Sequence, residues 1–142
     1  FRSGVSRMTK IYAVHFLQDD GRHLLGSHSG RDAKPWKVGE TRTATGILSL
    51  CENGYHFAPT WEAAYQGGFI YGPVACIVEV DQKPDNMACD GFKGVSRKRK
   101  LIEMHTMEPR DFRRYKNMCG SKRGAKKFAE FMGKLTGWYA VP

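Results

Sequence analysis

Residues 74–80, with the sequence VACIVEV, decide the fold because they form the clearest strand pattern in the chain. Every position except Glu79 is apolar, and the turn-forming pair Gly72-Pro73 stands directly before the run. A short apolar run rich in β-branched residues and bounded by a turn is typical of a strand buried on both faces. We therefore place residues 74–80 at the centre of a sheet.

Further strands are expected on both sides of this central one. Residues 11–17 (IYAVHFL) are β-branched and aromatic, and they stop at the turn-forming Asp19-Asp20-Gly21. Residues 95–104 have a strand pattern whose first half is a basic edge, Arg97-Lys98-Arg99-Lys100. Shorter strands are predicted at 36–38 and 47–51, and a loop at 83–94.

Three helices are predicted, two of them short. Thr60 is a suitable N-cap for a helix at residues 61–65, which Gly67-Gly68 ends. A second helix is expected at 109–115. From Gly124 onward, apolar side chains recur at helical spacing and form one stripe: Phe128, Phe131, Met132 and Leu135.

The order of these elements predicts the α+β class. We expect a small mixed or antiparallel sheet, a short helix after the Cys-x-x-Gly-x-His segment (residues 51–56), and C-terminal helices packed on the sheet. With 142 residues the chain is long enough for one domain. We divide it into a tag or upstream extension at 1–7, a core at 8–104, and a basic helical segment at 105–142 packed on the core.

Composition narrows the location and the chemistry. No apolar run reaches the ~20 residues of a membrane-spanning helix, so no membrane partner is expected. The four cysteines, Cys51, Cys76, Cys89 and Cys119, are too far apart for a CxxC pair. We interpret them as reduced structural thiols, which favours a cytoplasmic protein. Neither a metal site nor a common nucleophile, Rossmann or P-loop motif is predicted.

The positive charge is confined to the C-terminal third. Residues 1–96 hold ten basic and ten acidic residues, whereas residues 97–142 hold thirteen basic and four acidic residues and so carry the whole net charge of +9. Clustered Lys and Arg beside aromatic residues suit a nucleic acid or another polyanion. A solvated face without a partner is the alternative interpretation. The predicted phosphate contacts are Arg97, Arg99, Arg113, Arg114, Lys122 and Arg123.

Two histidines suggest a pocket. His15 and His56 each lie in an aromatic strand segment, so their imidazoles would face one pocket if the strands are neighbours. Each alone is equally explained as a hydrogen-bonded core or surface histidine.

The quoted segments also resemble known families. IYAVHFLQDDGR, WKVGET, LCENGYHFAPTWEAAY, YGPVACIVEV and VSRKRKLIEM occur in the order seen in a phage-encoded domain family of unknown function. This resemblance covers roughly residues 10–104. It implies a phage or prophage origin, hence the cytoplasm of the host cell or a virion, and it implies no activity.

A weaker resemblance is to the ADP-ribosyltransferase fold, through GYHFAPTWEAAYQGG and GPVACIVEV. It implies NAD as cofactor, with His15 and Tyr55 or His56 lining the dinucleotide site and Glu103 as the catalytic anion. A cationic ribosyl transition state needs such a fixed negative charge nearby. The chain departs from the family pattern at Phe16, where small residues are usual.

Three functions follow, in this order. The first is a small phage-type accessory protein that binds nucleic acid or another polyanion through its basic C-terminal region. The second is an ADP-ribosyltransferase-like enzyme that uses NAD. The third is a structural component of a virion or other large assembly. The oligomeric state is left open.

Overall fold

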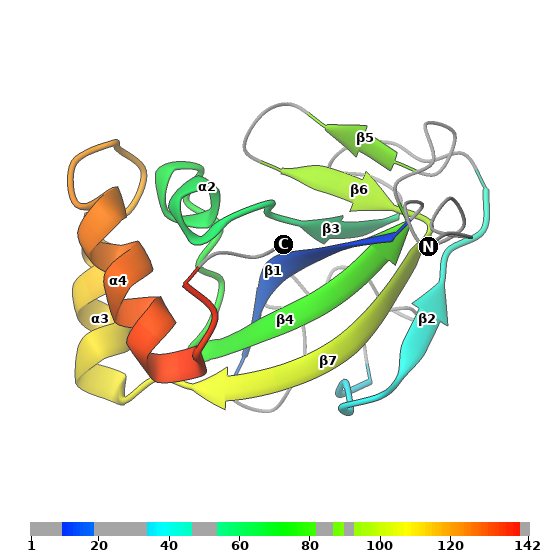
Figure 1. The fold of residues 1–142 in the computed structure, drawn as a ribbon, viewed down its shortest axis with the longest axis horizontal. Helices are drawn as coiled ribbons and strands as arrows, with labels where there is room; N and C mark the ends of the chain where they lie inside the picture. Colours follow the sequence, from blue (N-terminus) through cyan, green and yellow to red (C-terminus); the bar gives the residue numbers. More distant parts are fainter. Residues whose placement is uncertain (1–9, 19–33, 47–53, 82–86, 90–92, 140–142) are drawn as a thin grey trace, which may run out of the picture.

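A computed structural model describes residues 10–18, 34–46, 54–81, 87–89 and 93–139 (Figure 1). Within this part the protein is α+β, with two small antiparallel sheets and three helices, as the sequence predicts. The strands are β1 Lys10–Leu17, β2 Thr41–Thr43, β3 Tyr55–Phe57, β4 Val74–Asp81, β5 Met87–Cys89, β6 Gly94–Ser96 and β7 Lys98–Thr106. The helices are α2 Trp61–Gln66, α3 Pro109–Met118 and α4 Ala125–Thr136.

The larger sheet has the strand order β1-β4-β7-β2, and the smaller one has the order β3-β6-β5. Strand β4, predicted as central, is hydrogen-bonded to β1 on one side and β7 on the other. An antiparallel bridge between Val14 and Ala58 joins the two sheets, with both N to O distances at 2.8 Å. This bridge places the end of β3 beside β1.

The strand predicted at 95–104 is two strands. The chain leaves the smaller sheet after Ser96 and enters the larger one at Lys98. At Arg97, between them, the backbone carbonyl accepts from Ala44 N at 2.7 Å, and the side chain also binds residues 44 and 46. These contacts with a distant segment divide a run that looks continuous in sequence.

Two other strand-level expectations were also wrong. Residues 36–38 form a turn region, and the nearby strand begins at Thr41. The expected loop at 83–94 contains β5 and the first residue of β6. The strand predicted at 47–51 and the turn at 19–21 lie outside the described residues, as do residues 1–7.

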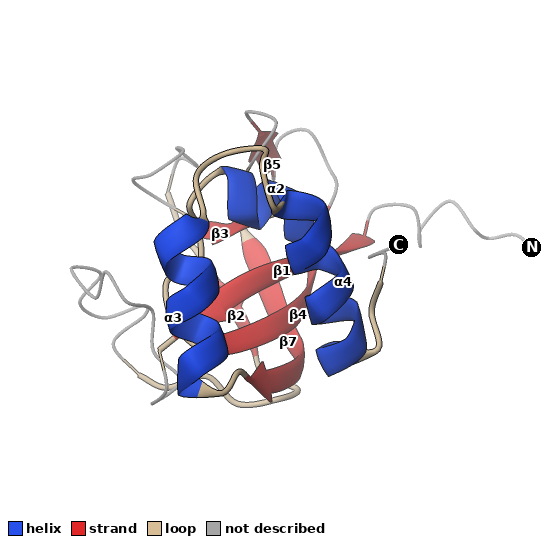
Figure 2. Cartoon of the chain, turned by 90° about the vertical axis from the view of Figure 1, so that its left-hand side faces the viewer, coloured by secondary structure: helices blue, strands red, loops and turns tan. Residues whose placement is uncertain are grey.

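The larger sheet separates two apolar clusters. Alternation along β1 directs Val14 and Phe16 to one face and Ala13 and Leu17 to the other. The first face packs against the three helices, which stand in front of the strands in Figure 2. The second face packs against Trp36 and Tyr55.

The helices follow their sequence signals. Thr60 Oγ1 accepts from Ala63 N at 3.0 Å and caps α2. The predicted stripe of α4 faces inward, with Phe128 and Met132 fully buried. Helix α4 starts after Gly124, whose φ of 90° suits glycine and where an added Cβ would lie 2.7 Å from Tyr65 Oη.

Candidate functional site

Helices α3 and α4 and their connection form one basic unit, here called the basic hairpin (residues 109–136). It occupies the end of the molecule opposite β2 (Figure 1). It holds nine Lys and Arg residues against Asp111 and Glu130, a net charge of +7. The positive charge of the C-terminal third is thus concentrated on one structural element.

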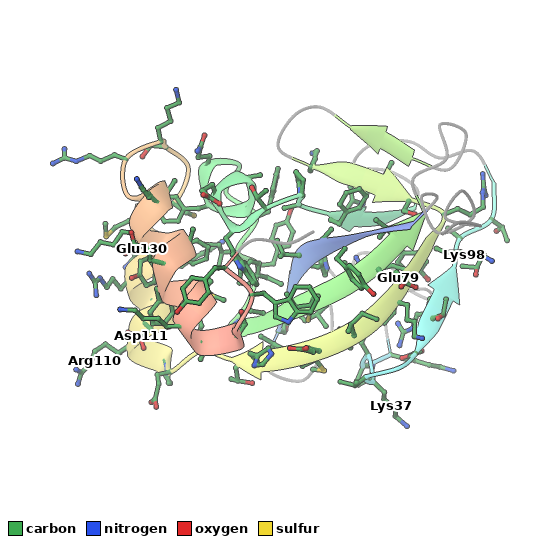
Figure 3. All side chains as sticks on the ribbon, in the orientation of Figure 1. Lys37, Glu79, Lys98, Arg110, Asp111 and Glu130 are labelled. Carbon is green, nitrogen blue, oxygen red and sulfur yellow. The ribbon has the colours of Figure 1, made fainter. Side chains whose placement is uncertain are left out.

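Packing explains why these charges point outward. Tyr115 and Phe128 are buried with ring centroids 5.1 Å apart, and Phe128 also contacts Tyr65, at 5.2 Å. Most polar positions of both helices are therefore exposed, and Figure 3 shows Arg110 extending away from α3. The exposed cations are Arg110, Arg113, Arg114, Lys122, Arg123, Lys126, Lys127 and Lys134, and Lys116 is half-buried.

None of these cations forms an ion pair within the described part of the chain. Arg114 lies over the Tyr115 ring, with its Cζ 5.2 Å from the centroid. Because the charges are not neutralised internally, they are available to an anionic partner.

The structure brings four of the six predicted phosphate contacts together on this hairpin and separates the other two. Arg113, Arg114, Lys122 and Arg123 are exposed there. Arg97 is half-buried at the sheet junction, where Nη1 donates to Ala44 O at 3.2 Å and to Gly46 O at 3.0 Å.

Arg99 corrects the prediction most clearly. Its relative exposure is 2%, and its Cζ lies 4.7 Å from the Trp36 ring centroid and 5.0 Å from that of Tyr55. Its Nη1 donates to His56 O at 2.6 Å. A phosphate in solvent does not reach a guanidinium held in this way. The neighbours Lys98 and Lys100 are the exposed members of the run, because side chains alternate along β7.

The two candidate histidines do share a cavity. His15 on β1 and His56 on β3 line a space of about 20 Å³, together with Phe69, Tyr71 and Lys93. The Val14–Ala58 bridge holds the two strands in this position. The His15 and Tyr71 rings meet edge-on, with centroids 6.4 Å apart. A volume of this size holds about one water molecule.

Glu103 lies on the other face of the larger sheet. Directly opposed residues of antiparallel strands share a face. Glu103 is opposite Ile77, which belongs to the helix-side cluster, whereas His15 is opposite Cys76 of the second cluster. Glu103 and His15 therefore lie on opposite faces of the sheet. Tyr55 is buried against Trp36. The residues that the ADP-ribosyltransferase resemblance implies, His15, Tyr55, His56 and Glu103, do not form one site.

Glu103 has partners of its own. Its Oε1 lies 2.7 Å from His105 Nε2, and its Oε2 accepts from Trp138 Nε1 at 3.1 Å. The hydrogen bond with His105 lowers the pKa of Glu103, burial opposes this, and the Trp138 bond adds to the lowering. Trp138 O in turn accepts from Trp61 Nε1 at 2.6 Å, so the group ties the chain after α4 to β7 and α2.

Arg110, Lys126 and Lys127 are exposed on the basic hairpin and are not among the six predicted phosphate contacts. Helical spacing predicts that Lys126 and Lys127 are exposed, because both fall outside the apolar stripe of Phe128 and Met132. Tyr71, which lines the histidine cavity, has no such signal.

Other kinds of site are not found in the part that the structure describes. No cluster of three or more His, Cys, Asp or Glu residues there is arranged to hold a metal ion. None of the described helices has the length and apolar character to span a membrane. No family model, curated protein or solved structure matches this chain. The two family resemblances therefore stay predictions.

Proposed function

We propose that this protein binds nucleic acid through the basic hairpin. The observation that carries the proposal is the net charge of +7 on one helical unit whose described cations have no ion pairs. Lys and Arg side chains that neutralise phosphates release condensed counterions, and this release drives binding. Exposed cations with aromatic neighbours also suit strands with unpaired bases.

The packing of the hairpin supports a binding role over a merely solvated face. Phe128 and Met132 anchor α4 in the core, and Tyr115 anchors α3. The cations therefore project from a fixed frame, so that little backbone order must be gained when a strand binds. Their positions on both helices and the connection between them give a surface several phosphates long.

The first experiment is a salt titration of oligonucleotide binding, followed by fluorescence anisotropy. A variant with Arg113, Arg114, Lys122 and Arg123 all changed to Gln removes the four exposed predicted contacts. We expect its affinity at 100 mM salt to fall at least ~10-fold, and the slope of log K against log salt to decrease by roughly 3, at about 0.7 per phosphate contact for a single strand.

The matched control removes four charges from the opposite end. Lys34, Lys37, Lys98 and Lys100 are exposed there, and Figure 3 shows Lys37 and Lys98 far from the hairpin. Changing all four to Gln should alter the affinity less than about 3-fold, since only long-range attraction is lost. Equal losses in both variants would show that net charge alone drives binding, and would contradict a site on the hairpin.

The proposal also favours a cytoplasmic location, in a host cell if the protein is of phage origin. Nucleic acid is accessible there, and cysteines outside disulfides persist in a reducing compartment. Cys76 and Cys119 are such free cysteines, and burial raises the pKa of the Cys76 thiol to about 12, which makes it unreactive.

One observation favours a second candidate, NAD binding. His15 and His56, which the ADP-ribosyltransferase resemblance implies for the dinucleotide site, line one cavity. The cavity of about 20 Å³ must open to admit a nicotinamide ring. A thermal shift with NAD at 500 mM salt, lost in a His15→Ala and His56→Ala double variant, would favour this candidate over the first. Because Glu103 lies on the opposite face of the larger sheet, this candidate concerns NAD binding alone and assigns no catalytic role to Glu103.

A further inference from the structure

A groove of about 630 Å³ lies beside the basic hairpin, between the start of α3 and the adjoining ends of β4 and β7. Tyr71 and Phe112 supply aromatic rings, and Met107 contributes to the apolar floor. Arg113 and Lys116 stand on the α3 side, and none of the described residues that line the groove is acidic. The groove therefore combines ring surfaces with positive charge.

Helix α3 presents these groups together. Phe112 and Lys116 are four residues apart, so they lie one above the other on the same side of the helix, and Arg113 is adjacent. Because α3 starts at Pro109 and is anchored by buried Tyr115, the backbone positions that carry the ring and both cations are fixed relative to the groove.

The floor of the groove is also fixed. Met107 is buried, and its N–H donates to Pro73 O at 2.8 Å, which joins the end of β7 to the turn before β4. Gly72 in that turn packs so closely on β1 that a Cβ would lie 2.1 Å from Leu17 O. The groove is thus formed by well-packed backbone and exists without a ligand.

We propose that this groove receives unpaired bases of a single-stranded nucleic acid. The bases stack on Phe112 and Tyr71, and the phosphates of the same nucleotides contact Arg113 and Lys116. The inference rests on the proposed function and adds a substrate class to it, single strands in preference to duplexes.

Size and chemistry both select this occupant. The volume lies within the range of sites for small organic ligands, which accommodates one or two nucleotides. In a duplex the bases are paired and stacked inside the helix, so only phosphates would reach the hairpin. An acidic peptide would satisfy the cations and leave the aromatic surfaces without a planar partner.

The experiment compares a 15-nucleotide single strand with a duplex of the same sequence at one salt concentration. We expect the wild-type protein to bind the single strand about 10-fold more tightly. Phe112→Leu keeps an apolar side chain against the core and removes the ring. It should reduce single-strand affinity about 5- to 10-fold, because base stacking on the ring is lost, and leave duplex affinity and the salt slope unchanged.

Phe131→Leu is the matched control, since Phe131 is also a half-buried aromatic of the hairpin but does not line the groove. It should alter neither affinity. An independent readout uses 2-aminopurine in the strand, whose fluorescence is quenched when the base stacks. We expect quenching on binding to the wild-type protein and much less with Phe112→Leu.

The outcomes separate the two proposals. Salt-sensitive binding with equal single-strand and duplex affinities, or without 2-aminopurine quenching, would overturn the groove inference and leave the hairpin proposal standing. Absence of salt-sensitive binding to either nucleic acid would overturn the hairpin proposal itself. Displacement of the strand by polyglutamate at equal charge concentration would show that charge alone is recognised, and would also overturn the inference.

Discussion

At the β2 end of the larger sheet, Arg42 and Arg99 lie against the Trp36 ring, with their Cζ atoms 4.1 Å and 4.7 Å from its centroid. At the other end, the cations of the basic hairpin point into solvent without ion pairs in the described part of the chain. The same residue type therefore has a structural role at one end and remains available for binding at the other. Arginine content alone does not locate a nucleic-acid surface. Contact with aromatic rings from other parts of the sequence, Trp36 and Tyr55, decides that Arg99 is buried.

The largest effect that tests this comparison is expected for Arg99→Met. Methionine retains the apolar stem but loses the contacts with Trp36 and Tyr55 and the bond to His56 O. A desolvated cation–π contact and a charged hydrogen bond together stabilise by about 3 kcal/mol, so the free energy of unfolding should fall by that amount. Urea denaturation measures it.

Arg114→Met is the control on the hairpin. Arg114 is exposed and contacts only the Tyr115 ring among its described neighbours, so the free energy of unfolding should change by less than about 0.5 kcal/mol. If Arg99→Met were equally mild, the distinction between structural and available arginines would be wrong.

Arg42→Met should have an intermediate effect. Arg42 also lies over Trp36, its Nε lies 2.7 Å from Glu40 Oε2, and its Nη2 donates to Lys34 O at 3.1 Å and to Pro35 O at 2.8 Å. These bonds to the carbonyls are solvent-exposed, and the side chains of Arg42 and Glu40 are 12% and 32% exposed. Partly solvated pairs and cation–π contacts stabilise less, so we expect a loss of about 1 kcal/mol in urea denaturation. A loss as large as that of Arg99→Met would mean that Arg42, Trp36 and Arg99 stabilise the fold as one unit. The losses in the Arg42→Met/Arg99→Met double variant would then not be additive.

Tyr65→Phe, on α2, tests whether the basic hairpin is held against the rest of the protein by apolar packing alone. Tyr65 Oη is buried beside Gly124 and has no hydrogen-bond partner among the described residues. Burial raises the pKa of Tyr65, in keeping with a hydroxyl removed from water. Removing a buried, unsatisfied hydroxyl should leave stability unchanged or increase it by up to about 1 kcal/mol in thermal denaturation. A clear destabilisation would show that the hydroxyl has a bound partner.

Sequence patterns predicted the parts of the fold that local periodicity controls. The stripe through Phe128 and Met132 gave α4, Thr60 marked the start of α2, and the apolar run at 74–80 gave the central strand β4. Each of these depends on residues close together in the chain.

Contacts between distant segments could not be predicted in the same way. The division at Arg97 depends on carbonyls of residues 44 and 46, and the burial of Arg99 depends on Trp36 and Tyr55. Strand alternation directs the basic run to two faces, but alternation does not identify the aromatic rings that contact one of these faces. The meeting of His15 and His56 depends on which strands are neighbours, and the Val14–Ala58 bridge that brings β1 and β3 together joins residues far apart in the chain.

The smallest expected effect is a pH dependence of stability that comes from Glu40, at the β2 end of the larger sheet. The side-chain hydrogen bond from Arg42 lowers the pKa of Glu40, with the Lys37 backbone N–H adding to it and burial opposing it. A carboxyl whose pKa is lower in the folded than in the unfolded state stabilises the fold above the unfolded value of about 4.5. That contribution is lost as the pH falls through the lower, folded-state pKa.

Glu40→Gln should therefore narrow the difference in unfolding free energy between pH 7 and pH 3 by a few tenths of a kcal/mol, as expected for a partly exposed pair. The pKa of Glu103 is also lowered, so Glu103 contributes separately to the pH dependence of the unfolding free energy. The effect of Glu103→Gln should therefore add to that of Glu40→Gln. Both are measured by urea denaturation across this range. If Glu40→Gln left the pH dependence unchanged while Glu103→Gln reduced it, the contact between Arg42 and Glu40 would be a solvated pair. The structural role of Arg42 would then rest on Trp36 and on the carbonyls of residues 34 and 35.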